Sequence, residues 1–150
     1  MIKLNDISKS FKNKKALDNL SLEVSSGEIY GLLGANGAGK STTLNLLLGF
    51  LSPDSGSIEI IDSTNNKTIT NNEIGFIAEN VNLYPYLSGL ENLDYFNRIA
   101  GIKFNSSELK SLLNECGLEE DAYNKPTSDY SKGMRQKVGI AIALAKNAKI

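Results

Sequence analysis

The sequence predicts an α/β fold in which a mixed sheet, with antiparallel N-terminal strands and a parallel core, carries a helical insert. Three patterns support this prediction. Residues 3–7 and 20–24 alternate apolar and polar side chains, as half-exposed antiparallel strands do. Residues 28–33 form a short, largely apolar run that suits a buried parallel strand. From Ser88 onward apolar residues recur at helical spacing, which predicts a helical subdomain before the last helix.

Turn signals separate the other strands predicted in the first half. Residues 12–15 are polar and predict a turn between the first two strands. Residues 53–56, Pro-Asp-Ser-Gly, are a strong turn signal and precede a predicted strand at 57–62. Residues 65–72 are polar and predict a loop, after which residues 74–78 predict a short apolar strand.

Capping signals define the helices of the second half. Ser88 with Glu91, and Asn105 with Glu108, each match a capping box at a helix start. Ser131 is a natural N-cap for a third helix that runs into the apolar residues 140–145.

A glycine-rich loop is the most informative segment. Residues 34–42 read Gly-Ala-Asn-Gly-Ala-Gly-Lys-Ser-Thr and fit G-x-x-x-x-G-K-[ST], the pattern of a loop that holds nucleotide phosphates. Glycines allow the backbone amides to turn inward around a phosphate, Lys40 supplies a positive charge, and the Ser41 hydroxyl can ligate Mg²⁺. The loop lies between the predicted strand 28–33 and a predicted helix at 43–50, which is the order this motif requires. The predicted phosphate-binding residues are Gly34, Asn36, Gly37, Ala38, Gly39, Lys40, Ser41 and Thr42.

Composition sets bounds on the function. The chain has 150 residues, is 41% hydrophobic and has a net charge of −1, which predicts one soluble globular unit and disfavours a nucleic-acid binder that works by overall basicity. The single Cys116 and the absence of a charged-then-apolar leader favour a cytosolic setting. Because no apolar run approaches the span of a bilayer, any membrane role is expected to come through a partner.

A second motif indicates the family. The run Tyr130-Ser131-Lys132-Gly133-Met134-Arg135-Gln136-Lys137 resembles the signature of ATP-binding-cassette (ABC) ATPases, commonly written L-S-G-G-Q-Q-Q-R. Ser131, Gly133, Gln136 and the basic Lys137 match the signature. Tyr130, Lys132 and Met134 replace a leucine, a glycine and a glutamine.

The order of the motifs extends this resemblance over essentially all 150 residues. Phe11 stands where the family carries an aromatic that stacks on adenine, and residues 75–79 end where the family's Q-loop begins. The glutamate at the Q-loop and the Ser-Lys-Gly-Met signature look most like the cassettes of bacterial ABC exporters. The resemblance implies a P-loop NTPase fold and a partial ABC ATP-binding domain. Its expected parts are a P-loop core with antiparallel strands at 1–83, a helical subdomain at 84–130, and the signature helix with the start of the next strand at 131–150.

The resemblance also implies roles around ATP and Mg²⁺. Lys40 and Glu79 are expected to act in catalysis, and Ser41 and Glu79 to hold the metal. Glu79 replaces a glutamine, so it can still accept a hydrogen bond from a water molecule bound to Mg²⁺, but adds a charge and loses an amide donor. Phe11 is expected to stack on the base, the alternative being a core phenylalanine at a strand end. For Glu79 the alternative is a solvated surface carboxylate.

Two subunits are expected to form the complete site. By the resemblance, Ser131 and Gly133 would contact the ATP held by a second cassette, most simply in a homodimer. The alternative interpretation is that these residues only cap a helix, and both interpretations can be true at once. The other implied partner is a transmembrane permease, which would hold the subunit at the cytoplasmic face of the membrane. Export is favoured over import, whereas the transported substrate is not readable from a cassette.

Hydrolysis in this family needs residues that this sequence lacks. The Walker B Asp and Glu belong to a strand that would begin near Ala148-Lys149-Ile150, and the chain has no histidine for the family's switch position. A truncated cassette is therefore expected, one equipped to bind ATP and poorly equipped to hydrolyse it. The missing strands would leave apolar sheet edges uncovered, which predicts marginal stability.

Three other functions are compatible with the sequence. One is a soluble ABC ATPase that acts on ribosomes or DNA, and another is a nucleotide-binding module without turnover. The third is a P-loop GTPase or small-molecule kinase. GTPases typically carry N-K-x-D, and the Asn-Lys pairs at residues 13, 66 and 124 all lack the aspartate.

Overall fold

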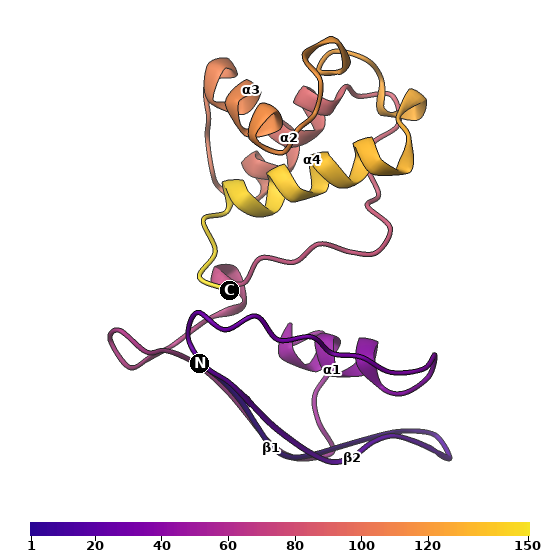
Figure 1. Ribbon diagram of the computed structural model, residues 1–150, viewed down its shortest axis with the longest axis vertical. Helices are drawn as coiled ribbons and strands as arrows, with labels where there is room; N and C mark the ends of the chain where they lie inside the picture. The colour runs from indigo at the N-terminus through magenta and orange to yellow at the C-terminus, as the bar shows by residue number, and fades with distance from the viewer. The chain divides into compact units, whose positions relative to one another are not determined.

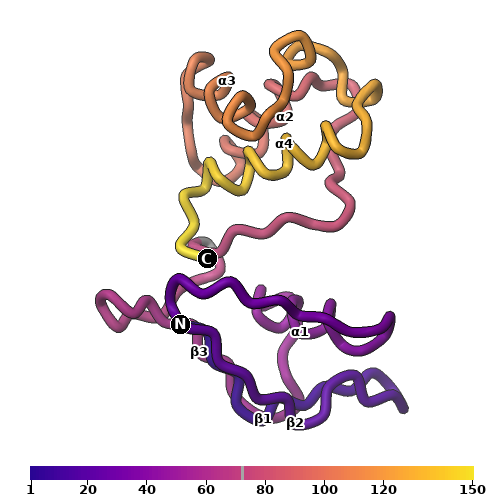
Figure 2. The backbone as a smooth tube through the Cα atoms, in the orientation of Figure 1, coloured from indigo at the N-terminus to yellow at the C-terminus, as the bar shows by residue number. Residues whose placement is uncertain are grey.

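The computed structural model describes residues 1–71 and 73–150. The chain divides into two compact units, Met1–Ile74 and Gly75–Ile150. Figure 2 follows the backbone through both units by residue number.

The first unit contains a four-stranded sheet. Strands β1 (Ile2–Phe11), β2 (Lys14–Val24), β3 (Ser55–Asp62) and β4 (Lys67–Thr68) lie in the order β2-β1-β3-β4, and every neighbouring pair is antiparallel. The strands predicted at 3–7, 20–24 and 57–62 are confirmed. The predicted loop 65–72 instead contains the two-residue β4 and the start of a 3-10 helix, η1 (Asn71–Glu73).

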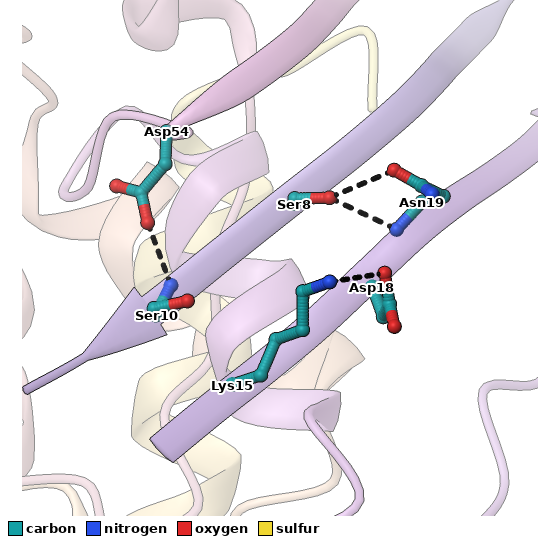
Figure 3. Close-up of polar contacts among 6 residues, drawn as sticks. All are labelled: Ser8, Ser10, Lys15, Asp18, Asn19 and Asp54. Carbon is teal, nitrogen blue, oxygen red and sulfur yellow. Dashed lines mark hydrogen bonds and ion pairs between the residues drawn. The ribbon is translucent and has the colours of Figure 1, made fainter. Parts of the chain in front are cut away.

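The β1–β2 ladder is irregular in its middle. The register shifts between Leu4 and Ile7 and again between Ile7 and Lys9, and Asn19 has a φ of 47°. In Figure 3 the Ser8 hydroxyl donates to Asn19 Oδ1 at 3.0 Å and accepts from Asn19 N at 3.0 Å. A serine side chain thereby satisfies backbone and side-chain groups where the regular ladder is interrupted.

Helix α1 (Lys40–Leu47) lies along the sheet within this unit, as Figure 1 shows. Its Leu46 is buried with Leu4, Ile7 and Leu17 from the sheet. A helix here is confirmed, although it spans residues 40–47 and not the predicted 43–50. Leu44 is 45% exposed.

The predicted parallel strands are absent from the described residues. Residues 28–33, 74–78 and 148–150 are not strands, and Ile29 and Leu33 are 99% and 92% exposed. A strand exists only by pairing with a neighbour, and none of these segments forms a ladder with another described segment. One backbone bond, from Gly75 N to Ile150 O at 2.6 Å, joins two of them, which is too little to make a strand pair.

The second unit is helical. Helices α2 (Gly89–Ile99), α3 (Ser106–Glu115) and α4 (Lys132–Ala145) pack on one another around a core that includes Leu93, Leu113 and Val138. The capping boxes predicted at Ser88 and Asn105 and the N-cap at Ser131 are confirmed. Two short 3-10 helices, η2 (Glu120–Ala122) and η3 (Thr127–Asp129), lie between α3 and α4. By its contacts, α4 belongs with the helices that precede it.

A buried asparagine joins α2 to the segment before it. Asn92 is fully buried; its Oδ1 accepts from Tyr84 N at 2.8 Å, and its Nδ2 donates to Ser88 O at 2.9 Å and Tyr84 O at 3.1 Å. This side chain therefore replaces hydrogen bonds that the irregular backbone around Tyr84 cannot make with itself.

Candidate functional site

The phosphate-loop pattern forms a turn that leads directly into α1. Gly37 and Gly39 have φ values of 83° and 94°, in the left-handed region that favours glycine. A Cβ on Gly39 would lie 2.6 Å from Leu17 Cδ2 and 2.8 Å from Ala16 O. Gly39 is therefore required both by its backbone angle and by the close approach of β2.

Lys40 reaches back across the start of the loop. Its Nζ donates to Gly34 O at 2.6 Å and to Ala35 O at 2.8 Å. These two bonds hold the ammonium over the turn that contains Gly37 and Ala38, where it can meet an anion bound by the loop.

The N-terminus of α1 lacks a capping side chain. Its N-cap is Gly39, no side chain bonds the first turn, and that turn contains no acidic residue. Helices α2, α3 and α4 are each capped by a side-chain oxygen, from Ser88, Asn105 and Ser131. The amides and dipole of α1 are therefore open to an external anion, and the exposed Ser41 lies in the same turn.

Phe11 ends β1 and is 46% exposed. The Lys9 ammonium lies 5.9 Å from the centre of its ring and forms an ion pair of 2.7 Å with Asp54. Asp54 also accepts from Ser10 N at 2.7 Å, as Figure 3 shows. The Lys9 hydrogen bond, and then the Ser10 amide, lower the pKa of the Asp54 carboxyl below its ordinary value of 3.8. Asp54 thus holds the end of β1 that carries the ring.

The signature segment begins α4. Ser131 and Gly133 are exposed, and Ser131 Oγ accepts from Met134 N at 3.2 Å as the N-cap. Tyr130, which replaces the leucine of the signature, is 4% exposed and donates its hydroxyl to Ala122 O at 2.5 Å. Burial raises the pKa of this phenol. Tyr130 is therefore a core residue that anchors the segment.

Glu79 is joined to the signature helix through its backbone. Its side chain is exposed, and its carbonyl accepts from Gln136 Nε2 at 2.6 Å. A polar cavity of about 320 Å³ lies beside this contact, lined by Asn80, Val81, Asn82, Lys132, Arg135 and Gln136.

The predicted site residues form two groups. Phe11 and the loop residues 34–42 belong to the first unit, where residues 16–17 of β2 touch the loop at Gly39. Glu79, Ser131 and Gly133 belong to the second unit, where Gln136, on the same helix as Gly133, donates to the carbonyl of Glu79. The supporting roles of Leu17, Asp54 and Gln136 were missed. Asp54 was identified only as a turn residue, and its pairing with Lys9, 45 positions earlier, has no local sequence signal.

The residues that the structure describes do not form a metal site of several carboxylate, histidine or cysteine side chains. They contain no group of three or more His, Cys, Asp or Glu side chains able to hold a metal ion. Mg²⁺ is usually held by one or two protein oxygens together with phosphates and water, and at the loop the hydroxyl-bearing Ser41 is exposed. Among the same residues, every helix is too short or too polar to cross a bilayer.

Comparison with known proteins gives a consistent result. A family model described as "ABC transporter" matches residues 17–150. The bacitracin transport ATP-binding protein BcrA of Bacillus licheniformis is 39% identical over 146 residues, covering 96% of this chain and 47% of that protein. The lantibiotic transport ATP-binding protein SrtF of Streptococcus pyogenes is 35% identical over the whole chain and 64% of its own length. The chain thus spans about half to two thirds of these relatives.

Solved structures agree on the fold. An ATP-binding cassette in a dimeric, post-hydrolysis state bound to ADP and Pi superposes with a TM-score of 0.80 at 30% identity, covering 99% of this chain and 71% of that one. A putative ABC transporter ATP-binding protein from Pyrococcus furiosus gives a TM-score of 0.81 at 25% identity over 98% and 71% of the two chains. The predicted α/β fold class is confirmed.

Proposed function

Because the chain belongs to the ABC transporter family, we propose that it is the ATP-binding part of a transporter's ATPase subunit, which couples ATP binding and hydrolysis to transport through a membrane partner. The observation that supports this most is the loop of residues 34–41. Its left-handed glycines, the ammonium of Lys40 and the uncapped start of α1 converge on one place. Each of these attracts a phosphate for a separate physical reason.

The proposed roles follow the two groups of residues. Phe11 stacks on adenine, and residues 34, 36–40 and 42 surround the phosphates. Ser41 and Glu79 hold Mg²⁺, which screens the phosphate charge and orients the terminal phosphate. Lys40 binds the same phosphates directly. Glu79 also orients water, with the altered charge that a carboxylate brings in place of an amide.

The second nucleotide contact is proposed to come from a partner copy. Ser131 presents a hydroxyl, and Gly133 an exposed amide, at the start of α4, which suits a γ-phosphate held by another subunit. One chain then supplies half of each of two sites. Light scattering of the protein with ATP, with hydrolysis blocked, should show dimers; a species that stays monomeric would contradict this proposal.

The proposed transport role is supported by the relatives BcrA and SrtF, which are named for bacitracin and lantibiotic transport. Export is favoured because Glu79 and the Ser-Lys-Gly-Met signature resemble exporter cassettes. We place the subunit at the cytoplasmic face of the membrane on a permease. Within it, residues 1–83 would serve as the core, 84–130 as the helical subdomain and 131–150 as the signature helix and the start of the next strand.

ATP binding is the direct test. Isothermal titration with ATP and Mg²⁺ should show binding by the full chain, and Lys40→Ala should weaken it about tenfold or more because a charge-assisted phosphate contact is lost. Lys67→Ala, which removes an exposed lysine on β4, should leave the affinity unchanged. Equal affinity of the Lys40 and Lys67 variants would refute the proposed site.

Hydrolysis needs its own measurement. Phosphate release by the unmodified protein should be compared with release by Glu79→Ala. Among the described residues only Glu79 is proposed to orient the attacking water, so we expect slow release that falls further in the variant. Equal release by the two proteins would contradict this role of Glu79.

A further inference from the structure

We propose that Lys14 is a second cationic ligand of the nucleotide. It binds the α- and β-phosphates between Phe11, the ring proposed to stack on adenine, and the phosphate loop. The inference rests on the proposed ATP-binding function and adds a residue to that site. It depends on the position of Lys14 in the β1–β2 hairpin, on the distance from its ammonium to the phosphate loop, and on which nearby lysines pair with carboxylates.

The strand register places Lys14 beside Phe11, the ring proposed to stack on the base. Phe11 and Lys14 are direct partners across the β1–β2 turn, at the last pair of the ladder. Directly opposed residues in an antiparallel pair have Cα atoms only about 4.5–5.5 Å apart. The backbone of Lys14 is therefore as close to a base stacked on Phe11 as any residue of β2.

The ammonium of Lys14 reaches the phosphate loop. Lys14 Nζ lies 3.9 Å from the position that a Cβ on Gly37 would occupy. Gly37 is the middle glycine of the loop, with a φ of 83°. Lys14 thus extends from the side of the base to the side of the phosphates, whereas Lys40 bonds the first residues of the loop, Gly34 and Ala35.

Two other lysines of the same hairpin pair with carboxylates. Lys9 is paired with Asp54 at 2.7 Å and Lys15 with Asp18 at 2.5 Å, a contact drawn in Figure 3. Lys14 is exposed and pairs with no carboxylate among residues 1–71 and 73–150. An unpaired cation beside a loop built for phosphates has the charge and the freedom to bind one.

The position predicts which phosphates are involved. The α-phosphate is the one nearest the base, so a cation beside the Phe11 platform meets the α- and β-phosphates before the γ-phosphate. Removing the charge of Lys14 should therefore weaken the binding of ATP and of ADP by similar factors. Adenosine, which has no phosphate, should be unaffected.

The experiment is a competition titration of the full chain with a fluorescent ATP analogue, displaced by ATP, ADP or adenosine. Lys14→Gln should weaken the binding of ATP and ADP about two- to fivefold, the range of one exposed charge contact, and the loss should shrink at high salt. Lys14→Arg should restore the affinity. Lys12→Gln removes an exposed lysine of the same turn that forms no ion pair with a carboxylate among the described residues, and the variant should bind ATP like the unmodified protein.

The outcomes separate the two proposals. Three results for Lys14→Gln would overturn the role of Lys14. They are an unchanged affinity for ATP, a loss of affinity for ATP but not for ADP, and an equal loss of affinity for adenosine. If Lys40→Ala still loses binding in those cases, the proposed ATP site stands. If the unmodified protein does not bind ATP, the proposed function fails and the role of Lys14 fails with it.

Discussion

Gly39→Ala isolates the steric requirement of the phosphate loop. Gly39 has a φ of 94°, and a Cβ there would lie 2.6 Å from Leu17 Cδ2 and 2.8 Å from Ala16 O. Leu17 can rotate away, but the carbonyl of Ala16 belongs to β2 and cannot move without disturbing the strand. Left-handed backbone costs a residue with a Cβ about 1–2 kcal/mol, and overpacking adds about 1–3 kcal/mol. The expected loss of stability is about 2–5 kcal/mol.

Gly27→Ala is the matched control. Gly27 has a φ of 77°, and a Cβ there would meet nothing within 4 Å. Both variants carry the backbone cost and the same change in unfolded-chain entropy, so their difference measures the clash alone, about 1–3 kcal/mol.

Urea unfolding and ATP titration together test the prediction. Gly39→Ala should unfold at lower urea than Gly27→Ala and bind ATP more weakly, because a displaced Gly39 also moves Lys40 and Ser41 at the start of α1. If the two variants unfold alike and bind ATP alike, the close packing of β2 against the loop is refuted.

Three further substitutions test other parts of the structure. Asn92→Ala should lower the free energy of unfolding by about 2–3 kcal/mol, because it leaves buried backbone groups around Tyr84 unpaired; a loss no larger than that of the exposed Asn114→Ala, by urea unfolding, would contradict this. Ser131→Ala should cost about 1 kcal/mol through the lost cap of α4, and Ser131→Asp should recover it in a thermal melt. An unchanged melting temperature for the alanine variant would exclude the cap. The pKa of Asp54 is lowered in the folded protein, so its contribution is present above pH 3.8 and declines as the pH falls through the folded value. The stability difference between the unmodified protein and Asp54→Asn should therefore shrink below pH 3.8, and a difference that grows on acidification would reverse the assigned sign.

Local signals explain what was predicted well. Both capping boxes, at Ser88 and Asn105, and the cap at Ser131 depend on residues three positions apart, so the sequence shows them directly. The phosphate loop is similar, because its glycines and Lys40 act within eight residues. The apolar run 28–33 was misassigned because a strand depends on a partner that the run itself does not reveal.

The supporting residues of the site show the same limit. Nothing local indicates that Asp54 holds the end of β1 beside Phe11, since it lies 45 positions from Lys9 in the chain. Tyr130 looked like a replaced signature residue, and its burial against Ala122 explains the replacement as packing.

From the sequence alone come the nucleotide-binding loop, the helix starts and the resemblance to ABC cassettes, because each is encoded in residue types at short, fixed spacings. The tertiary structure decided which groups approach one another across long separations. It placed Ala16 and Leu17 against Gly39, Lys14 beside Gly37, and Gln136 on the carbonyl of Glu79. Such contacts depend on how strands and helices pack, and packing is set by the whole unit and not by any one segment.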